Sequence, residues 1–487
     1  MSEPSLYWHD YETYGTDPRR DRPAQFAGLR TDYQFNIIGE PLVVYCKLAD
    51  DCLPEPLACL ITGITPQIAD SRGVSEAQFA DTILREMAKP GTCVLGYNNL
   101  RFDDEVTRHL LYRNLFDPYQ REWDNGNSRW DLIDVVRAAY ALRPDGIEWP
   151  KTSEGLVTFR LEELTKANGI EHEMAHDALS DVYATIAVAK LIQNAQPRLY
   201  DFLFENRGKA AATRLLRVGQ YQPIVHVSGK YPSKKHSLAV VLPICPHPTN
   251  NNGFIVYDLS ADPEALLTLS VEEIKQRIFT ATKDLPEEVD RIPLKTVHVN
   301  KCPVLAPINV VRPQDAERLE IDLELCFRHI ERIRNANVPA LSDKIAAVFE
   351  MGYQERDNDP DLMLYSGGFF AESDKREMAR IHKTSPDALS SLTPTFYDDR
   401  LTEMFFRYRA RNFPHTLSSE EREKWRQKCC RRLLEPGYNS LTFQEFIEKL
   451  NNMSLDSSVD PSVVSALREY ADSKASRLAI ELASYGV

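Results

Sequence analysis

In the first third of the chain, apolar runs alternate with segments whose apolar positions recur every three to four residues. The runs 6–12 (LYWHDYE), 40–48 (EPLVVYCKL) and 92–98 (TCVLGYN) have the length and the alternation of buried or half-buried strands. Helical spacing predicts helices from about residue 102, over 130–142 and over 176–193. Strands that alternate with helices indicate an α/β layer with helices on the faces of a sheet.

The pattern changes from about Tyr221 onward. Short β-like runs follow one another, separated by turn residues such as those of HPTNNNG, at 223–230, 237–245, 253–260 and 294–305. Helical segments interrupt them, and Ser270 with Glu273 fits a capping box at a helix start. These features predict a small barrel or sandwich decorated by helices.

Beyond 351–361 the β pattern nearly disappears and helical spacing continues to Val487. Two more candidate capping boxes, Asp374 with Glu377 and Ser418 with Glu421, mark helix starts. We therefore predict an α/β domain over 1–194, a barrel domain with a helical insertion over 197–350, and a helical domain over 353–487.

Composition places the chain among soluble globular proteins, since 43% of its 487 residues are hydrophobic and 27% are charged. The net charge of −14 argues against a protein that coats nucleic acid nonspecifically, although one groove can still be basic. The nine cysteines form no CxxC pair and are expected to be reduced thiols. Because no apolar run is long enough to span a bilayer and no signal peptide begins the sequence, we predict a cytoplasmic protein.

Two carboxylates end the first predicted strand. Asp10 and Glu12 stand two residues apart, and strand side chains alternate with period two, so both point to the same side. Neighbouring anions repel unless something neutralises them. A divalent cation explains the pair, and so does a plain solvated strand end.

Further acidic residues follow in the same predicted domain. Asp103 lies near the first turn of a helix that follows a buried strand, and His176 and Asp181 lie at the start of another helix. Metal-assisted phosphodiester cleavage uses such a set: carboxylates hold two Mg²⁺ ions about 3.5–4 Å apart, and an imidazole takes a proton from water. Asp103 alone also fits a helix-start anion, and His172 is an alternative base to His176.

Together these motifs resemble the DEDD exonuclease family in its histidine branch, because His176 stands in the place where the other branch has a Tyr shortly before the last Asp. Longer stretches are similar to the bacterial exonuclease I family, among them HDYETYGTDPRRDRPAQFAGLRTD, GYNNLRFDDE, AHDALSDVYATIA, HVNKCPVLAP and YRARNFP. The resemblance implies an α/β, ribonuclease H-like mixed sheet flanked by helices, an SH3-like β-barrel domain and an α-helical C-terminal domain.

The resemblance also implies an activity: 3′ to 5′ degradation of single-stranded DNA to 5′-mononucleotides by two-metal-ion hydrolysis, in DNA repair and recombination. Asp10, Glu12, Asp103 and Asp181 are then the ligands of two Mg²⁺ ions, with Mn²⁺ as a substitute, and His176 is the general base. Glu12 and Arg160 are expected to touch the substrate as well.

Single strands are held by basic grooves with aromatic platforms. Besides Glu12 and Arg160, we expect DNA contacts from Tyr97, Arg108, Arg137, Lys230, Lys235, Lys301 and Arg407. The stretch around Arg407 also fits packing against acidic surface of another domain. The family further implies a partner, the acidic C-terminal tail of single-stranded-DNA-binding protein, for which Arg143, Arg312 or Arg334 are candidate contacts, and a monomeric enzyme.

Two other functions fit the same residues. One is a 3′–5′ exoribonuclease or proofreading exonuclease, because the acidic motifs do not distinguish DNA from RNA. The other is a non-catalytic single-strand-binding adaptor. The four acidic residues argue against this alternative, because anions that face phosphates weaken binding.

Overall fold

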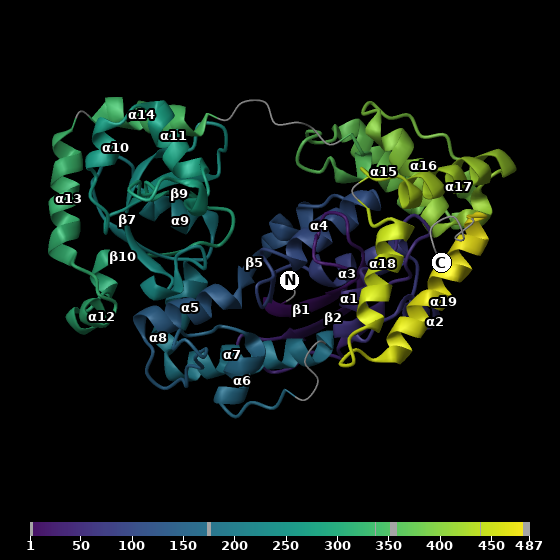
Figure 1. The fold of residues 1–487 in the computed structure, drawn as a ribbon, viewed down its shortest axis with the longest axis horizontal. Coiled ribbons are helices and arrows are strands. Elements are labelled where there is room, and N and C mark those ends of the chain that lie inside the picture. The colour runs from purple at the N-terminus through teal and green to yellow at the C-terminus, as the bar shows by residue number, and fades with distance from the viewer. Residues whose placement is uncertain (1–2, 173–176, 337, 351–357, 439, 481–487) are drawn as a thin grey trace. The chain divides into compact units, whose positions relative to one another are not determined.

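A computed structural model describes residues 3–172, 177–336, 338–350, 358–438 and 440–480 (Figure 1). The chain forms two compact units. The first contains residues 1–129, 172–183 and 356–487, and the second contains residues 130–171 and 184–355. The first unit therefore joins the beginning of the chain to its end.

A five-stranded sheet runs in the order β3-β2-β1-β4-β5. Its strands are β1 (Ser5–Thr13), β2 (Pro23–Thr31), β3 (Leu42–Tyr45), β4 (Thr92–Gly96) and β5 (Ser128–Asp131). Strand β1 lies in the middle, antiparallel to β2 and parallel to β4. The sheet is thus mixed, and the predicted strands at 6–12, 40–48 and 92–98 are confirmed.

Strand β2 was missed by the sequence analysis. Its apolar side chains Ala24, Phe26 and Leu29 are buried, whereas its polar side chains Gln25 and Arg30 break the apolar pattern. Arg30 reaches Glu86 at 3.4 Å, and its guanidinium lies 4.8 Å from the ring centre of Tyr7. These polar residues are held by contacts that a local pattern does not reveal.

Helices of the first unit come from both ends of the chain. They are α1 (Pro56–Thr62), α2 (Pro66–Arg72), α3 (Glu76–Met87), α4 (Asp103–Arg113), α15 (Glu372–Lys383), α16 (Arg400–Asn412), α17 (Ser419–Leu434), α18 (Phe443–Ser454) and α19 (Pro461–Leu478), with α7 (Ala178–Ala195) beginning in this unit. The capping box of Ser418 and Glu421 is confirmed. The box predicted at Asp374 is wrong: Asp374 lies inside α15, is fully buried and accepts a hydrogen bond from the Tyr397 N–H at 2.7 Å.

One hydrophobic cluster unites the two ends of the chain within this unit. It contains Tyr14, Ala24 and Cys59 from the first part, together with Phe443 and Leu467 from helices α18 and α19. Lys474 of α19 is fully buried, and its ammonium donates hydrogen bonds to the carbonyls of Ala49, at 3.0 Å, and Cys52. The helical end of the chain is therefore part of the same folded body as β1 and β2.

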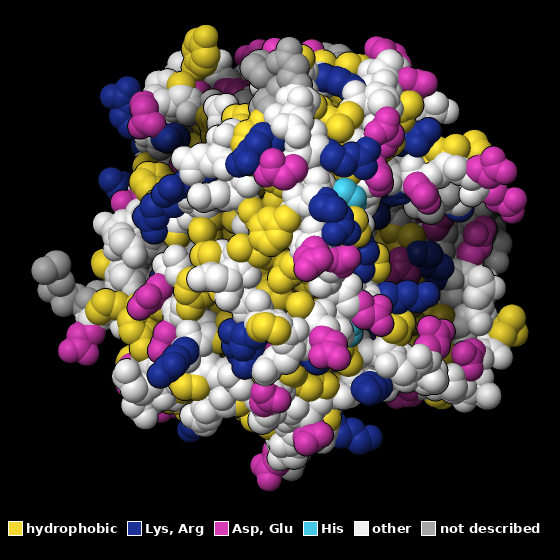
Figure 2. All heavy atoms as spheres, turned by 90° about the vertical axis from the view of Figure 1, so that its left-hand side faces the viewer, with side chains coloured by type: hydrophobic (Ala, Val, Ile, Leu, Met, Phe, Trp, Pro, Cys, Tyr) yellow, Lys and Arg dark blue, Asp and Glu magenta, His cyan; other side chains and the backbone are white. Residues whose placement is uncertain are grey.

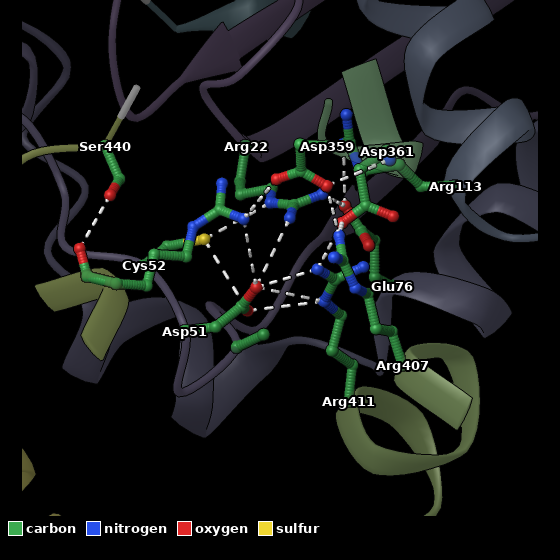
Figure 3. Close-up of polar contacts among 12 residues, drawn as sticks. Arg22, Asp51, Cys52, Glu76, Arg113, Asp359, Asp361, Arg407, Arg411 and Ser440 are labelled. Atoms are coloured by element: carbon green, nitrogen blue, oxygen red, sulfur yellow. Dashed lines mark hydrogen bonds and ion pairs between the residues drawn. The ribbon is translucent and has the colours of Figure 1, made fainter. Parts of the chain in front are cut away.

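Buried ion pairs reinforce this connection (Figure 3). Asp51 is 1% exposed, and Arg411 of α16 approaches its carboxylate at 2.7 Å. Arg22 and Arg432 lie 3.8 and 3.9 Å from the same carboxylate. Although burial raises the pKa of Asp51, the charges of Arg411, Arg22 and Arg432 hold it well below its ordinary value. We call Asp51 with these three arginines the Asp51 cluster.

The second unit contains an antiparallel five-stranded sheet in the order β10-β6-β7-β8-β9. Its strands are β6 (Ile224–Val227), β7 (Leu238–Pro246), β8 (Gly253–Asp258), β9 (Leu294–His298) and β10 (Val304–Pro307), as the four β-like runs predict. Its helices are α5 (Leu132–Leu142), α6 (Leu161–Ala167), α8 (Pro197–Glu205), α9 (Lys209–Leu215), α10 (Glu264–Thr268), α11 (Val271–Phe279), α12 (Pro313–Arg318), α13 (Leu323–Asn335) and α14 (Val338–Phe349). The capping box of Ser270 and Glu273 is confirmed at the start of α11.

On the molecular face drawn in Figure 2, Lys and Arg side chains are interspersed with Asp and Glu. Basic side chains are therefore exposed on this face, although the chain as a whole has more acidic than basic residues. Within the part of the chain that the structure describes, no helix is both long and apolar enough to cross a membrane.

Candidate active site

Three carboxylates meet in the first unit. Asp10 and Glu12 of β1 and Asp181 of α7 each offer an oxygen, and these oxygens lie within 4.8 Å of one another. Asp10 and Glu12 share a side of β1 because they stand two residues apart in an extended strand. The two-residue spacing of Asp10 and Glu12 therefore places both carboxylates in one acidic group. Asp181, about 170 positions further along the chain, completes this group.

Strand β2 helps to place α7 beside β1. Gln25 pairs with Glu12 in the β1–β2 register, and its side-chain oxygen accepts a hydrogen bond from the Ala178 N–H at 3.4 Å. Asp177 accepts from the Ser180 N–H at 3.1 Å and so caps the start of the helix. The first turns of α7, including Asp181, are thereby held next to the end of β1.

Asp103 enters from the start of α4. Its Oδ1 accepts a hydrogen bond from the Tyr11 N–H at 3.2 Å, which places it next to Asp10. The neighbouring Asp104 points elsewhere and is fully buried: Arg121 and Arg129 approach its two oxygens at 3.0 and 2.7 Å. Asp103 is therefore the α4 carboxylate that lies by β1, and Asp104 anchors the helix.

The acidic group carries a strong electrostatic cost without a cation. Burial, followed by the charges of Asp103, Glu12 and Asp181, raises the pKa of Asp10 well above its ordinary value. Burial, followed by the charges of Asp181, Asp103 and Asp177, raises the pKa of Glu12 to about 8. Clustered carboxylate oxygens are the ligands that hard divalent cations prefer, so these residues fit a metal site.

Two histidines were considered as the general base. His176 lies outside the described residues. His172 is described, and its Nε2 lies 2.5 Å from Asp181 Oδ1. Its side chain is 5% exposed. The sequence suggested His172 as an alternative base but gave no signal of this contact.

Some of the predicted DNA contacts lie on the surface and others do not. Arg160 is 78% exposed, Lys230 and Lys301 are exposed, and Tyr97 is half-buried. Lys235 is exposed as well, and its ammonium reaches Asp258 at 3.0 Å. These residues remain candidates for contacts with a strand.

Three predicted DNA contacts instead lie in ion pairs. Arg108 is 5% exposed and pairs with Glu105 and Glu122 at 2.8 and 2.7 Å. Arg137 is 11% exposed at its side chain and pairs with Asp134 at 2.6 Å.

Arg407 is 5% exposed and pairs with Asp359, with Asp361 at 2.8 Å and with Glu403 at 2.9 Å. The guanidinium groups of Arg108 and Arg407 are thus engaged by carboxylates in this structure, and a DNA contact by either residue stays a prediction. The alternative for Arg407 was packing against acidic surface of another domain, whereas its partners Asp359, Asp361 and Glu403 belong to the same predicted helical domain as Arg407 itself.

The arginines suggested for a protein partner differ in their surroundings. Arg143 and Arg312 both pair with Asp315, at 3.2 and 2.7 Å. Arg334 is half exposed and pairs with Glu331 at 2.8 Å. Binding of a partner tail by these residues stays a prediction.

Comparison with known proteins agrees with the geometry. The Exonuclease family model matches residues 7–189, the span that holds the acidic group. A carboxylate cluster at the central strand of a mixed sheet, within such a span, defines a metal-dependent exonuclease. The Exonuclease I SH3-like domain matches residues 207–351, and the Exonuclease I C-terminal domain matches residues 358–474. The chain belongs to the exonuclease I family.

Similar proteins cover nearly the whole chain. Exodeoxyribonuclease I of Escherichia coli (strain K12) is 47% identical over 470 residues, covering 96% of this chain and 98% of that protein. An exonuclease I structure from Methylocaldum szegediense has a TM-score of 0.93 and 52% identity, covering 97% of this chain and 99% of that one. E. coli exonuclease I in complex with a dA16 oligonucleotide has a TM-score of 0.92 and 46% identity, covering 97% and 100%.

These findings confirm the predicted fold class, family and enzyme class. The chain is a hydrolase with an exonuclease domain, an SH3-like domain and an α-helical C-terminal domain. The residue boundaries of the three predicted domains stay predictions, because the chain's compact units follow a different division.

Proposed function

We propose that this protein removes nucleotides from the 3′ end of single-stranded DNA and releases 5′-mononucleotides. The observation that carries the proposal is the meeting of Asp10, Glu12 and Asp181 within 4.8 Å, in a chain of the exonuclease I family. The relative from E. coli has been crystallised with a dA16 oligonucleotide, which supports a single strand as the substrate. A role in DNA repair and recombination in the cytoplasm, as a monomer, goes with this proposal.

Asp10, Glu12 and Asp181 are the proposed ligands of the catalytic ions, with Asp103 as a further ligand. Two Mg²⁺ ions, or Mn²⁺ in their place, would activate a water and stabilise the leaving oxygen. Asp10 is the proposed shared ligand, since it lies with Glu12 and Asp181 and the N–H of the next residue, Tyr11, donates to Asp103. His176 is the proposed general base that accepts the proton of the attacking water.

Basic residues of the second unit are the proposed contacts with the phosphates of the strand. Arg160, Lys230 and Lys301 are exposed, and Lys and Arg at such positions gain affinity by displacing counterions from phosphates. Lys235 and, in the first unit, Tyr97 are proposed as weaker contributors, because Lys235 already reaches Asp258 and Tyr97 is half-buried.

In the first unit, exposed aromatic side chains are a further proposed contribution of the helical part, besides Arg407. The Tyr365 hydroxyl donates to Glu105 at 2.5 Å and accepts from Arg108 at 3.1 Å, which fixes it beside the first turns of α4. Phe369 is 89% exposed and meets Tyr119 edge-on at 6.0 Å between ring centres. An exposed ring near the helix that begins with Asp103 suits base stacking.

Degradation of a 5′-labelled DNA oligomer by the wild type, Asp10→Asn and Asp50→Asn tests the proposal. Asp10→Asn removes one charge from the acidic group, so cleavage should fall by several orders of magnitude, while Asp50→Asn changes an exposed carboxylate and should cleave normally. A ladder that shortens from the 3′ end, with mononucleotides as product, is expected. Full activity of Asp10→Asn, or faster degradation of a matched RNA oligomer, would contradict the proposal.

The proposed protein partner is the acidic C-terminal tail of single-stranded-DNA-binding protein. Arg143 and Arg312 lie together around Asp315, where an acidic peptide could compete for their charges. Titration of a labelled tail peptide against the wild type and Arg312→Ala checks this, and equal affinity for both would remove Arg312 from the contact.

A further inference from the structure

His172 lies against one of the acidic residues without belonging to the acidic group. It sits in the connection between α6 and α7, nine residues before Asp181. Its Nε2 is 2.5 Å from Asp181 Oδ1, and the exposed fractions of the two side chains are 5% and 19%. A contact this short and this shielded from solvent fixes the relative position of the ring and the carboxylate.

The chemistry of the contact gives it a direction. In the ionised form that binds a cation, a carboxylate oxygen only accepts hydrogen bonds, and two lone pairs facing each other at this distance would repel. Nε2–H therefore donates to Oδ1. Asp181 also offers an oxygen to the acidic group with Asp10 and Glu12, and a carboxylate has about four lone-pair sites, so one carboxylate can serve the imidazole and the metal at once.

Asp181 is the member of the group that most needs such support. Asp10 and Glu12 are fixed by the ladder of β1, whereas Asp181 comes from the start of a helix about 170 residues away. Hydrogen-bonded partners behind metal ligands orient them, and removing such a partner typically costs about 10–100-fold in metal affinity.

We propose that His172 is a positioning residue, whose Nε2–H holds the Asp181 carboxylate in the orientation that receives the catalytic cation. The inference rests on the proposed function, since it assigns a supporting role to a residue beside that metal site. It differs from the base role considered for His172 in the sequence, because the imidazole acts on the ligand and not on the attacking water.

Calorimetric titration with Mn²⁺ alone, without DNA, measures the effect directly. His172→Ala should bind Mn²⁺ about 10–100-fold more weakly than the wild type. His172→Gln keeps a side-chain N–H donor and should recover part of the loss. Melting curves in EDTA for all three proteins show whether the fold survives each substitution, independently of metal.

DNA cleavage over a range of Mn²⁺ concentrations completes the test. For His172→Ala, the Mn²⁺ concentration needed for half-maximal rate should rise, while the rate at saturating Mn²⁺ approaches that of the wild type. Unchanged Mn²⁺ affinity in His172→Ala would overturn the proposal, and so would normal Mn²⁺ binding with a rate that saturating metal does not restore.

The same experiment separates this inference from the proposed function. If the wild type degrades DNA and Asp10→Asn does not, the active site is confirmed whatever His172→Ala shows. If the wild type binds Mn²⁺ but leaves DNA intact, the proposed function fails while the effect of His172 on Mn²⁺ affinity can still be read.

Discussion

Replacing Asp51 by Ala should destabilise the first unit strongly, although Asp51 has no proposed role in catalysis. The substitution removes the carboxylate that Arg411, Arg22 and Arg432 share in the Asp51 cluster (Figure 3). Arg411 is 2% exposed, so water cannot replace the lost partner. Its remaining carboxylate is Asp361, at 2.5 Å, which Arg407 also uses.

The size of the effect follows from this geometry. With charge centres about 4 Å apart and an effective dielectric constant of about 20, one such pair is worth about 4 kcal/mol. The variant no longer buries a charged carboxylate at this position, and the absence of that desolvation cost offsets part of the loss. Removing one partner from a buried pair costs about 3–5 kcal/mol in practice, and we expect a loss in this range.

Asp50→Ala provides a matched control one residue away. Asp50 pairs with Arg477 of α19 at 2.9 Å, but both side chains are nearly half exposed, so this pair should contribute less than about 1 kcal/mol. Differential scanning calorimetry with EDTA present compares the variants. At about 2–4 °C per kcal/mol, Asp51→Ala should melt roughly 6–20 °C below the wild type. A shift under 2 °C, or an equal shift in Asp50→Ala, would refute the reasoning.

Three further outcomes follow from the site and its surroundings. The pKa of Glu12 in the folded protein is raised to about 8 from an ordinary 4.5, so between these pH values the folded metal-free protein binds a proton that the unfolded chain has lost. The melting temperature of the metal-free protein should therefore fall as pH rises from about 4.5 to 8. Mg²⁺ should make this dependence of the melting temperature on pH weaker. Phe369→Ala should weaken binding of single-stranded oligomers by a factor of at least about 5, measured by fluorescence anisotropy without metal, while an unchanged affinity removes Phe369 from the strand path. Arg160→Ala should lower DNA affinity and reduce its salt dependence by about one phosphate contact, whereas Arg407→Ala should lower the melting temperature; a DNA-binding defect in a fully stable Arg407→Ala would reverse that assignment.

The acidic group could be predicted from the sequence because the position of each of its residues follows from the geometry of a single strand or helix. The period of a strand places Asp10 and Glu12 on one side, and Asp181 lies in the first turn of a helix that Asp177 caps. Each element could therefore be predicted alone, and the order of the motifs pointed to one domain.

The partners of the basic residues could not be predicted in the same way. Whether an arginine faces a phosphate or a buried carboxylate depends on partners far along the chain: Asp51 and Arg411 are 360 residues apart. Arg407 and Arg108 were predicted as DNA contacts because their local sequence is basic and aromatic, and the structure adds ion pairs with Asp361 and Glu122 that this sequence does not reveal. The contact of His172 with Asp181 could not be predicted for a related reason, since the offset between them follows from the path of a connection and not from a repeating element.

The shared core of Tyr14 and Leu478 has a consequence for how the enzyme is made. A ribosome delivers the N-terminal strands first, but the apolar surface around Tyr14 stays uncovered until the final helix leaves the exit tunnel. A polypeptide cut short by a premature stop codon lacks that helix and the ammonium of Lys474 that binds the carbonyls of Ala49 and Cys52. A polypeptide that stops before α19 is therefore expected to expose the apolar surface around Tyr14 and to be less stable than the chain that contains this helix.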